Sequence, residues 1–478
     1  MKCLILAGGE GSRFNSRKEP KPLIPLLGVP LIERVILTAK KSGVNEFYVV
    51  IGHQNAQLRT HLEIFAKKRG ISITTLQNDE WKKDNGLSVL KAKHYIDENF
   101  ILLMCDHICD VSILKRLKNE NITEREVILV VDYNIDNNNN VDSVDATKVF
   151  VEKNNIVMDI GKKIPHYNAF DTGIFLCSPA IFRGLEESIQ KGDTSLSGGI
   201  REMTKNMKIR TIDIEDSLWV DIDNERMLKK AEHMLWESIK KQSDGPVMRV
   251  VNRPISMRIT RYLYKSNLTP NQISFISFLF AIFGACFFLL GGYSNLVVGA
   301  IFAQASSVID GVDGEIARLK CQETKFGAWF DTVLDRYSDA FLLFSLTIYV
   351  FRHLTQINSV FILFTGFIAI IGTFMNSYTA FKYEDFEALR GYDFQIGRDV
   401  RLFLIFLTGL FNLPFLALLL IALATNGENI RRILVLKQKT LNLHKTVSPP
   451  SLTSTMSLKD TSLGIPHSFI KEELSSSE

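Results

Sequence analysis

The sequence has few cysteines, and none of them has the spacing of a metal site or a disulfide framework. The six cysteines are scattered along the 478 residues without a Cys-x-x-Cys pair. This pattern excludes a zinc-ribbon site and is typical of a protein in a reducing compartment. Neither sign of charge dominates, because the net charge is only +4. Such a balance gives no support for nucleic-acid binding.

The start of the chain lacks the features of a secretory signal peptide. Met1 begins the short run Lys2–Ala7, which has the pattern of a buried strand. A signal peptide would instead have a basic start followed by a longer apolar core. We therefore expect the N-terminal region to stay in the cytoplasm.

The two halves of the chain differ sharply in composition. Residues up to about 250 mix charge, glycine and short apolar runs, as soluble α/β domains do. Residues from about 270 to 425 contain long apolar runs instead. We predict an all-α domain of six transmembrane helices, some including polar flanks because a span needs ~20 residues. They cover roughly residues 271–291, 294–314, 330–352, 358–380, 397–411 and 412–426.

Lysine and arginine are unevenly distributed between these predicted spans. The connections 315–325 and 381–401 and the chain after Arg431 carry basic residues, whereas the turns 291–295 and 412–414 carry no charge. Basic connections stay on the cytoplasmic side of a membrane. The pattern predicts a multi-pass protein of the cell membrane, with its N-terminal domain and C-terminal tail in the cytoplasm.

A glycine-rich segment directly follows the first apolar run. Gly8, Gly9 and Gly11 precede Arg13, and the backbone N–H groups of such a turn can cradle phosphates. Glycine turns after strands are common, so this segment alone is a weak signal. The sequence Glu-Pro-Lys-Pro-Leu-Ile-Pro-Leu at Glu19–Leu26 strengthens it. Together the two segments closely resemble the nucleotidyltransferase family that makes nucleoside-diphosphate sugars and alcohols.

This resemblance continues over residues 1–238 and implies an α/β, Rossmann-like fold of the nucleotide-diphospho-sugar transferases. Arg13 and Lys21 would bind the triphosphate of CTP and neutralise the charge that develops on diphosphate. A divalent cation, Mg²⁺ or Mn²⁺, would assist. The other implied residues are Gly8, Gly9 and Gly11 at the phosphates, Asn85 and Ser88 at the base, Asp106 and Asp221 as metal ligands with Asp223 in reserve, and Lys148, Lys162 and Asp171 at the acceptor.

Several of these residues have ordinary structural explanations. Asp106, at the end of an apolar run, would suit a turn or a helix cap equally well. Lys148 and Lys162 could be solvated surface lysines. His107, beside Asp106, is not expected to be a ligand. The whole series of matching segments favours an active transferase over an inactive domain retained as a scaffold.

Four aspartates at helical spacings occur within the apolar half. Asp310 and Asp313 are three residues apart, and Asp331 and Asp335 are four apart. Uncompensated carboxylates are costly in a membrane, so acids there indicate a functional site. Each pair lies on one helix face, and two such faces can bring oxygen ligands together around divalent cations. The aspartates alone leave a cation pathway open as an alternative to an enzyme.

The residues around these aspartates match a longer pattern. Asp-x2-Asp-Gly-x2-Ala-Arg-x8-Gly-x3-Asp-x3-Asp resembles the signature of the CDP-alcohol phosphotransferase family. The resemblance implies that Asp310, Asp313 and Asp331 hold Mg²⁺ or Mn²⁺. Asp335 would be the general base for the acceptor hydroxyl, and it could also contact the metal. The residues implied at the CDP-alcohol are Gly314, Arg318 and Gly327, with Arg318 paired to a phosphate.

Two basic segments flank the predicted bundle. Asn252–Asn267 alternates basic and apolar residues, which predicts an amphipathic helix on the membrane surface rather than an ordinary linker helix. Arg398 and Arg401 open the fifth span and could bind the phosphate of a phosphorylated acceptor. Positive-inside anchoring explains the same two arginines equally well. The tail from about Gln438 lacks periodicity and is predicted to be disordered.

These features divide the chain into four parts: a cytidylyltransferase domain at 1–238, a linker and interfacial helix at 239–269, a CDP-alcohol phosphotransferase domain at 270–430 and a tail at 431–478. Together the resemblances imply a bifunctional enzyme. CTP and myo-inositol 1-phosphate would give CDP-inositol and diphosphate. CDP-inositol and a second inositol 1-phosphate would then give di-myo-inositol phosphate phosphate, a compatible-solute precursor, and CMP. A homodimer is a further family-level expectation.

One alternative at the level of the reaction remains open. The membrane half could be a phospholipid synthase that takes a lipidic CDP-diacylglycerol donor. The N-terminal domain would then be inactive or serve another step. The sequence does not identify the polyol, and it does not say whether the final acceptor is soluble or lipidic.

Overall fold

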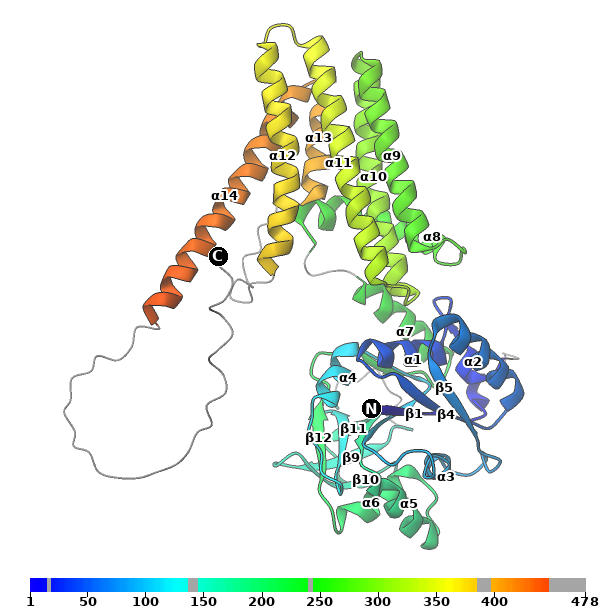
Figure 1. Ribbon diagram of the computed structural model, residues 1–478. Coiled ribbons are helices and arrows are strands. Elements are labelled where there is room, and N and C mark those ends of the chain that lie inside the picture. Colours follow the sequence, from blue (N-terminus) through cyan, green and yellow to red (C-terminus); the bar gives the residue numbers. More distant parts are fainter. Residues whose placement is uncertain (15–18, 136–144, 240–243, 385–396, 447–478) are drawn as a thin grey trace, which may run out of the picture.

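The N-terminal half is built around one mixed sheet. The computed structural model describes residues 1–14, 19–135, 145–239, 244–384 and 397–446 (Figure 1). In these residues the sheet has nine strands in the order β5-β4-β1-β6-β11-β8-β12-β10-β9. Their bounds are β1 (Lys2–Ala7), β4 (Glu46–Ile51), β5 (Ser72–Gln77), β6 (Phe100–Met104), β8 (Val127–Asp132), β9 (Lys148–Glu152), β10 (Ile156–Gly161), β11 (Ala169–Cys177) and β12 (Ile209–Asp213).

Helices cover both faces of this sheet. β1 pairs in parallel with β4 and β6, and its successive residues enter two different hydrophobic cores. A strand buried on both faces is apolar throughout rather than alternating, as Lys2–Ala7 is. One core includes α1 (Leu31–Lys41), α2 (Asn55–Arg69), α4 (Val111–Lys118) and α7 (Glu225–Ser238), and the other includes α3 (Asn85–Leu90), α5 (Ala180–Gln190) and α6 (Leu196–Thr204). The predicted α/β fold is confirmed for this half.

The second half is a bundle of long helices that stands on one side of the sheet domain (Figure 1). Each predicted span overlaps one of them. The helices are α9 (Pro270–Leu290), α10 (Tyr293–Leu319), α11 (Lys325–His353), α12 (Ser359–Glu384), α13 (Arg398–Leu410) and α14 (Pro414–Thr446). In the described residues, three of them (α9, α10 and α12 up to Ala380) are long and apolar enough to cross a membrane.

The helix bounds differ from the predicted spans in informative ways. α13 has only 13 residues, about 20 Å of helix, which is less than a bilayer's hydrocarbon core. α14 continues to Thr446, so the predicted disorder from Gln438 is wrong for the first residues of the tail. The rest of the tail, 447–478, lies outside the described residues.

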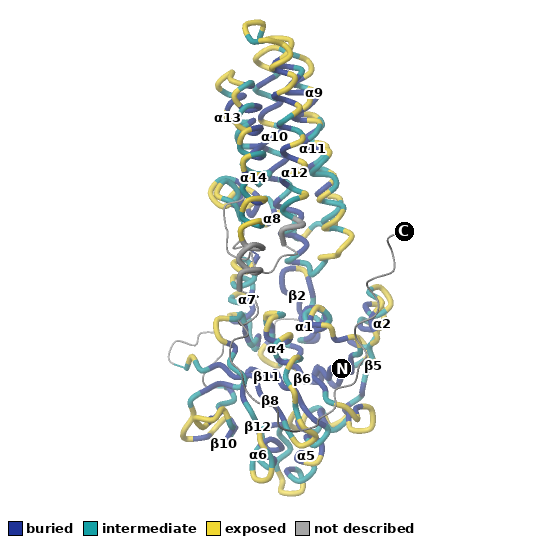
Figure 2. Tube along the Cα trace, turned by 60° about the vertical axis from the view of Figure 1, so that its left-hand side comes forward, coloured by how far each residue is buried: buried dark blue, intermediate teal, exposed yellow. Residues whose placement is uncertain are grey.

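Figure 2 shows that buried residues follow the strands and one side of each bundle helix.

The linker helix α8 (Arg253–Leu263) packs on α10 through a polar face. Glu315 of α10 is fully buried. Its Oε1 lies 2.6 Å from Arg253 Nη1 and accepts a hydrogen bond from Ser256, while its Oε2 accepts one from Thr260. The sequence predicted the helix but not this contact, because the alternation of basic and apolar residues does not show which side is buried.

Replacing Glu315 by alanine should destabilise the protein strongly. The substitution removes the acceptor of three buried hydrogen bonds, from Arg253, Ser256 and Thr260. A buried donor left unsatisfied costs about 1–3 kcal/mol, although Arg253 keeps Asp244 as its other charge partner. The thermal unfolding midpoint of the purified protein should therefore fall clearly. Glu80, which forms an exposed pair with Lys83, is the matched control, and Glu80→Ala should leave the midpoint unchanged. Similar midpoints for the two variants would contradict this role of Glu315.

The two halves meet at the C-terminal end of α10. Arg34 of α1 is buried, and its guanidinium donates to the Leu26 carbonyl at 2.7 and 3.0 Å and to the Leu319 carbonyl at 2.7 Å. Leu27 and Leu319 belong to one small apolar cluster across the same contact. The last carbonyls of a helix lack helical partners and carry partial negative charge. A buried arginine from the sheet domain satisfies one of them here.

Candidate active sites

Lys21 is the centre of a polar cluster beyond the carboxyl ends of β1 and β6. It begins a short helical turn, Lys21–Leu23, and its ammonium lies 2.5 Å from Asp106 Oδ2 and 2.8 Å from Asp223 Oδ1. Burial is the largest influence on its pKa and would lower it, but the surrounding carboxylates outweigh burial and raise the pKa of Lys21. The side chain therefore stays charged, as triphosphate binding requires.

Arg13 and the glycine loop lie beside Lys21. Arg13 Nη1 is 3.1 Å from Asp223 Oδ2, and its Nη2 pairs with Asp145. Asp223 thus holds both predicted phosphate-binding cations, one on each carboxylate oxygen. Gly11 has φ +67°, and a Cβ there would lie 2.6 Å from Lys21 Cβ. Only glycine lets the loop approach Lys21 this closely.

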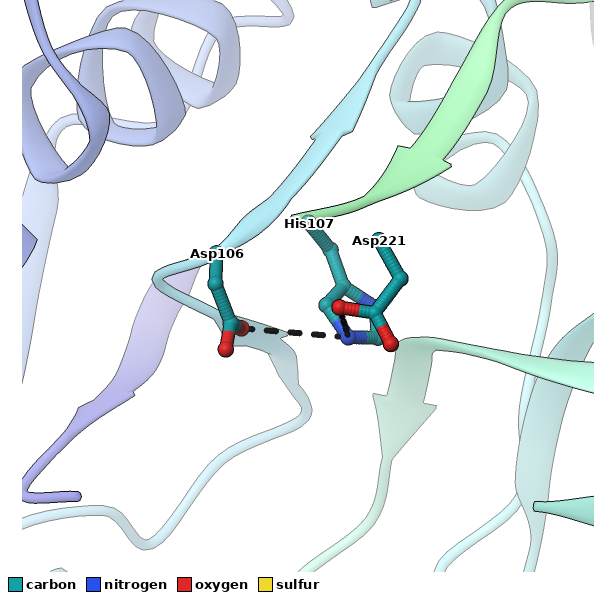
Figure 3. Close-up of side chains that lie close together, drawn as sticks. All are labelled: Asp106, His107 and Asp221. Carbon is teal, nitrogen blue, oxygen red and sulfur yellow. Dashed lines mark ion pairs between the residues drawn. The ribbon is translucent and has the colours of Figure 1, made fainter. Parts of the chain in front are cut away.

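Asp106, His107 and Asp221 bring their ligand atoms within 4.8 Å of one another (Figure 3). β7 (His107–Cys109) pairs with β13 (Trp219–Asp221), which sets His107 directly opposite Asp221. Asp221 Oδ1 is buried and makes no hydrogen bond in the described part of the chain. Burial, with the charges of Asp106 and Asp223, raises the pKa of Asp221 to about 6. An orphaned carboxylate oxygen in such a donor set fits a divalent cation.

The pKa values of the other two residues in this cluster reflect the same charges. Burial alone would raise the pKa of Asp106, but the Lys21 and His107 charges outweigh it and lower that pKa. Burial alone would lower the pKa of His107, but Asp221 and Asp106 outweigh it and raise that pKa. No sequence pattern groups His107 with the aspartates, because it is only the residue after Asp106.

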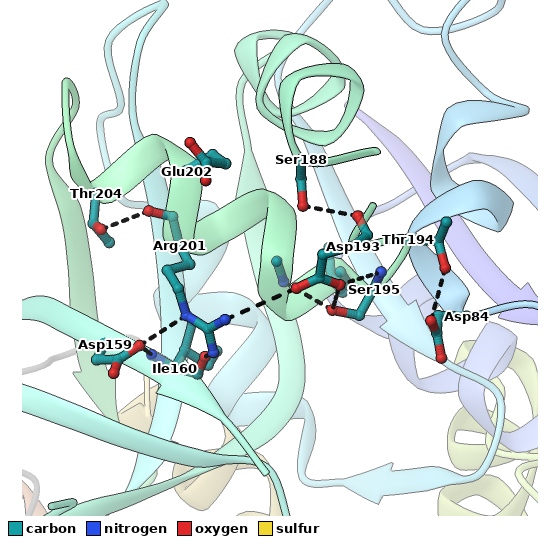
Figure 4. Close-up of polar contacts among 12 residues, drawn as sticks. Asp84, Asp159, Ile160, Ser188, Asp193, Thr194, Ser195, Arg201, Glu202 and Thr204 are labelled. Carbon is teal, nitrogen blue, oxygen red and sulfur yellow. Dashed lines mark hydrogen bonds and ion pairs between the residues drawn. The ribbon is translucent and has the colours of Figure 1, made fainter. Parts of the chain in front are cut away.

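The residues predicted at the base have partners within the protein. Asn85 Oδ1 accepts a hydrogen bond from the Leu196 backbone N–H at 2.9 Å, and Thr194 donates to Asp84 at 2.7 Å beside it (Figure 4). The buried Ser88 hydroxyl accepts from Asn78 at 2.9 Å. The first two contacts fix the start of α3 against the start of α6, and the third joins α3 to the residue after β5. Base recognition by Asn85 and Ser88 stays a prediction.

The residues predicted at the acceptor lie along β9, β10 and β11. Asp171 accepts a hydrogen bond from the Gly173 backbone at 2.7 Å, and burial raises the pKa of Asp171 to about 6. Lys148 places its ammonium 5.0 Å from the centroid of the Tyr167 ring, and Lys162 is exposed. Among the described contacts, neither lysine touches the Asp106 cluster. Their role at the acceptor stays a prediction.

The second site gathers aspartates from two bundle helices. Oxygen atoms of Asp310 and Asp313 from α10 and of Asp331 from α11 lie within 4.8 Å of one another. The Ser274 hydroxyl of α9 donates to Asp313. The donor set contains only oxygen, which suits Mg²⁺ or Mn²⁺. The helical spacing of the aspartates therefore produces the convergence that the sequence predicts.

Two arginines of α13 compensate the charge of this site. Arg398 Nη1 lies 2.8 Å from Asp310 Oδ1 and 2.6 Å from Asp335 Oδ1. Arg401 is buried, and its Nη2 lies 2.7 Å from Asp339 Oδ2. Asp339, which sequence reasoning missed, follows Asp335 by one helical turn, so the spacing rule applied to the other aspartates could have found it. Phosphate binding by the two arginines stays a prediction.

The remaining signature glycines lie at close contacts, Gly327 with Asn271 of α9 and Gly314 with Arg318 on its own helix. A Cβ at Gly327 would lie 3.0 Å from Asn271 Oδ1, and a Cβ at Gly314 would lie 3.1 Å from Arg318 Nη1. Arg318 Nε is buried and makes no hydrogen bond within the described residues. This N–H is a donor to which a phosphate oxygen could bind.

Known proteins match both halves of the chain. Two family models match, one described as a MobA-like NTP transferase domain over residues 3–153 and one as CDP-alcohol phosphatidyltransferase over residues 267–436. A "Bifunctional IPC transferase and DIPP synthase" of Rubrobacter xylanophilus is 33% identical over 453 residues, 91% of this chain and 96% of that protein. The chain belongs to this family. A member from Aquifex aeolicus is 32% identical over 91% of this chain and 98% of its own.

Membership of this family identifies both halves as enzyme domains, a nucleotidyltransferase and a CDP-alcohol phosphotransferase. It therefore favours enzymes over the cation-pathway alternative for the four aspartates. The chain is also similar to an "Archaetidylinositol phosphate synthase" of Pyrococcus horikoshii, at 29% identity over 40% of its length and 94% of that protein. This similarity is relevant to the alternative that the membrane half is a phospholipid synthase.

Proposed function

We propose that this chain makes CDP-inositol in its N-terminal domain and consumes it in its membrane domain. The observation that carries the proposal is the family relationship over both halves, at 33% identity along 91% of the chain. The two clusters described above supply the charged groups that both reactions need.

In the first reaction, a phosphate oxygen of myo-inositol 1-phosphate attacks the α-phosphorus of CTP. A P–O–P bond forms, the bond to the β-phosphate breaks, and diphosphate leaves. Lys21 and Arg13 hold the triphosphate and neutralise charge on the leaving group. Asp106 and Asp221 would hold a divalent cation, Mg²⁺ or Mn²⁺, which adds positive charge at the phosphates.

In the second reaction, a hydroxyl of another inositol 1-phosphate attacks the inositol-bearing phosphorus of CDP-inositol. The new P–O bond joins the two inositols, the bond to CMP breaks, and CMP leaves. Asp335 accepts the proton of the attacking hydroxyl. Asp310, Asp313 and Asp331 would hold Mg²⁺ or Mn²⁺, which offsets the charge of the diphosphate group. Arg318 and Arg398 are placed to bind phosphate oxygens.

We further propose that the membrane domain crosses the cell membrane six times, with the bilayer thinned locally around the short α13, and that both ends of the chain lie in the cytoplasm. The C-terminal end of α10 contacts Arg34 of the N-terminal domain, and Asp310 and Asp313 lie in the last turns of that helix. The aspartate site therefore opens on the side where CDP-inositol is made. A soluble donor and acceptor could reach it from the cytoplasm.

One assay tests the proposal. The purified protein is incubated with CTP, Mg²⁺ and each of several phosphorylated alcohols, and diphosphate and CMP are measured separately. Both products should appear with inositol 1-phosphate, and no lipid should be needed. Failure to release diphosphate with any alcohol would contradict the first half of the proposal.

The same assay tests the lipid alternative, which the similarity to the Pyrococcus horikoshii protein favours. If the membrane half is a phospholipid synthase, CMP should appear only when a CDP-diacylglycerol-type lipid is added. CMP release from CDP-inositol in lipid-free detergent would exclude that alternative.

A further inference from the structure

The orientation of the His107 ring is determined by a backbone carbonyl. His107 Nδ1 lies 2.5 Å from the carbonyl oxygen of Thr172. A carbonyl oxygen can only accept, so Nδ1 must carry the hydrogen. In the neutral ring Nε2 then has a free lone pair. Metal-binding histidines usually have this arrangement: one ring nitrogen donates a hydrogen bond to a carbonyl, and the other nitrogen binds the metal.

Three neighbouring residues hold the ring in this position. The Thr172 carbonyl also accepts a hydrogen bond from Trp219 Nε1 at 2.9 Å, and Trp219 is fully buried. Gly173 has φ +69°, and a Cβ there would lie 2.5 Å from His107 Nδ1. Only glycine leaves room for the ring. His107 therefore has little freedom to turn Nε2 away.

His107 Nε2 faces two carboxylate oxygens. It lies 3.4 Å from Asp221 Oδ1 and 3.8 Å from Asp106 Oδ1 (Figure 3). The other oxygen of Asp106 is engaged in a different contact, because Oδ2 accepts a hydrogen bond from Lys21. Ligand atoms about 2.1 Å from one ion are separated by about 3 to 4 Å. The two distances from Nε2 are thus those of ligands that share one coordination sphere.

We infer that His107 contributes Nε2 as the third protein ligand of the divalent cation at Asp106 and Asp221. This inference rests on the proposed cytidylyl transfer. It distinguishes the two sites on the chain, because the N-terminal site then has a nitrogen ligand and the membrane site has only carboxylates. An imidazole ligand shifts the preference of a site from Mg²⁺ towards Mn²⁺, Co²⁺ and Zn²⁺.

The experiment uses Mn²⁺ and the full-length, tag-free protein. Asp310, Asp313 and Asp331 are replaced by asparagine, so that the membrane cluster no longer binds the ion. Pulsed electron paramagnetic resonance in nucleotide-free, nitrogen-free buffer should then show a nitrogen coupling to the bound Mn²⁺. Labelling the protein with ¹⁵N-histidine should change that coupling. His107→Gln and His107→Asn should remove it and weaken Mn²⁺ binding by about tenfold or more.

His53 provides the matched control. It belongs to the same domain and packs its ring on Trp81, with centroids 4.8 Å apart, rather than on the aspartates. His53→Gln should leave both the nitrogen coupling and the Mn²⁺ affinity unchanged. The ¹⁵N-histidine-labelled protein that keeps His107 makes the test valid even if a His107 variant does not fold.

The outcomes separate this inference from the function on which it rests. Bound Mn²⁺ without a nitrogen coupling, or no bound Mn²⁺, would overturn the assignment of His107. Diphosphate release from CTP and inositol 1-phosphate by the wild-type protein is measured in parallel. If diphosphate is released and no nitrogen coupling is seen, the proposed function stands and the inference fails. If none is released, the proposed function itself fails.

Discussion

Asp335→Asn should lower CMP release from CDP-inositol by about 10²–10⁴-fold, the usual contribution of a general base. Asparagine has nearly the same shape and keeps an oxygen beside Arg398, whose Nη1 lies 2.6 Å from Asp335 Oδ1. It cannot take up a proton. The loss should therefore appear in kcat, and diphosphate release from CTP should be unchanged because that reaction occurs in the other domain.

The matched control for Asp335 is the next carboxylate on the same helix. Asp339 contacts Arg401 at 2.7 Å and lies 3.6 Å from Arg398 Nε, so Asp339→Asn removes the same charge from nearly the same place. We expect Asp339→Asn to act through the arginines and to cost much less in kcat. Equal losses for the two variants would show that charge, not proton transfer, explains the effect of Asp335.

Lys21→Met should reduce diphosphate release from CTP by about 10²–10³-fold, as the loss of a single group that stabilises developing charge does. The change removes the cation and leaves Asp106 and Asp223 without their shared partner, so CTP binding should weaken as well. CMP release from supplied CDP-inositol should remain at the wild-type rate. Diphosphate and CMP, measured separately, thus report the activities of the N-terminal site and the membrane site, respectively.

Lys83 is a suitable control for Lys21. Its ammonium pairs with Glu80 on the surface, so Lys83→Met removes one positive charge from the same domain without touching the cluster. It should leave both activities unchanged. If Lys21→Met lowered both reactions equally, general damage to the protein would explain the result better than loss of a phosphate-binding group.

The parts of the sites that could be predicted are those in which local spacing determines position. Asp310 and Asp313 lie on one face of α10 because a helix turns every 3.6 residues. The apolar run at β1 and the glycines after it likewise predict a strand and a phosphate loop without knowledge of the rest of the chain. Predictions of this kind depend only on a few residues that are neighbours in the sequence.

The contacts that escaped prediction join segments far apart in the chain. His107 directly follows Asp106, and neighbours in a continuous strand point to opposite faces. The chain instead turns between β6 and β7, which brings both side chains to one cluster. The carbonyl of Thr172 and the carboxylate of Asp145 likewise reach their partners only through the folded sheet. No local pattern marks such pairs.

The contact between Arg34 and the Leu319 carbonyl limits how the two halves can diverge. Every residue type has a backbone carbonyl, so a substitution at position 319 keeps the acceptor of this hydrogen bond. Positions 34 and 319 would therefore not show correlated substitutions among related sequences. An insertion in α10 is different, because one extra residue moves the carbonyl by about 1.5 Å and turns it by about 100°. The hydrogen bond to Arg34 therefore does not depend on which side chain stands at position 319, but it fixes the length of helix between Asp313 and Leu319.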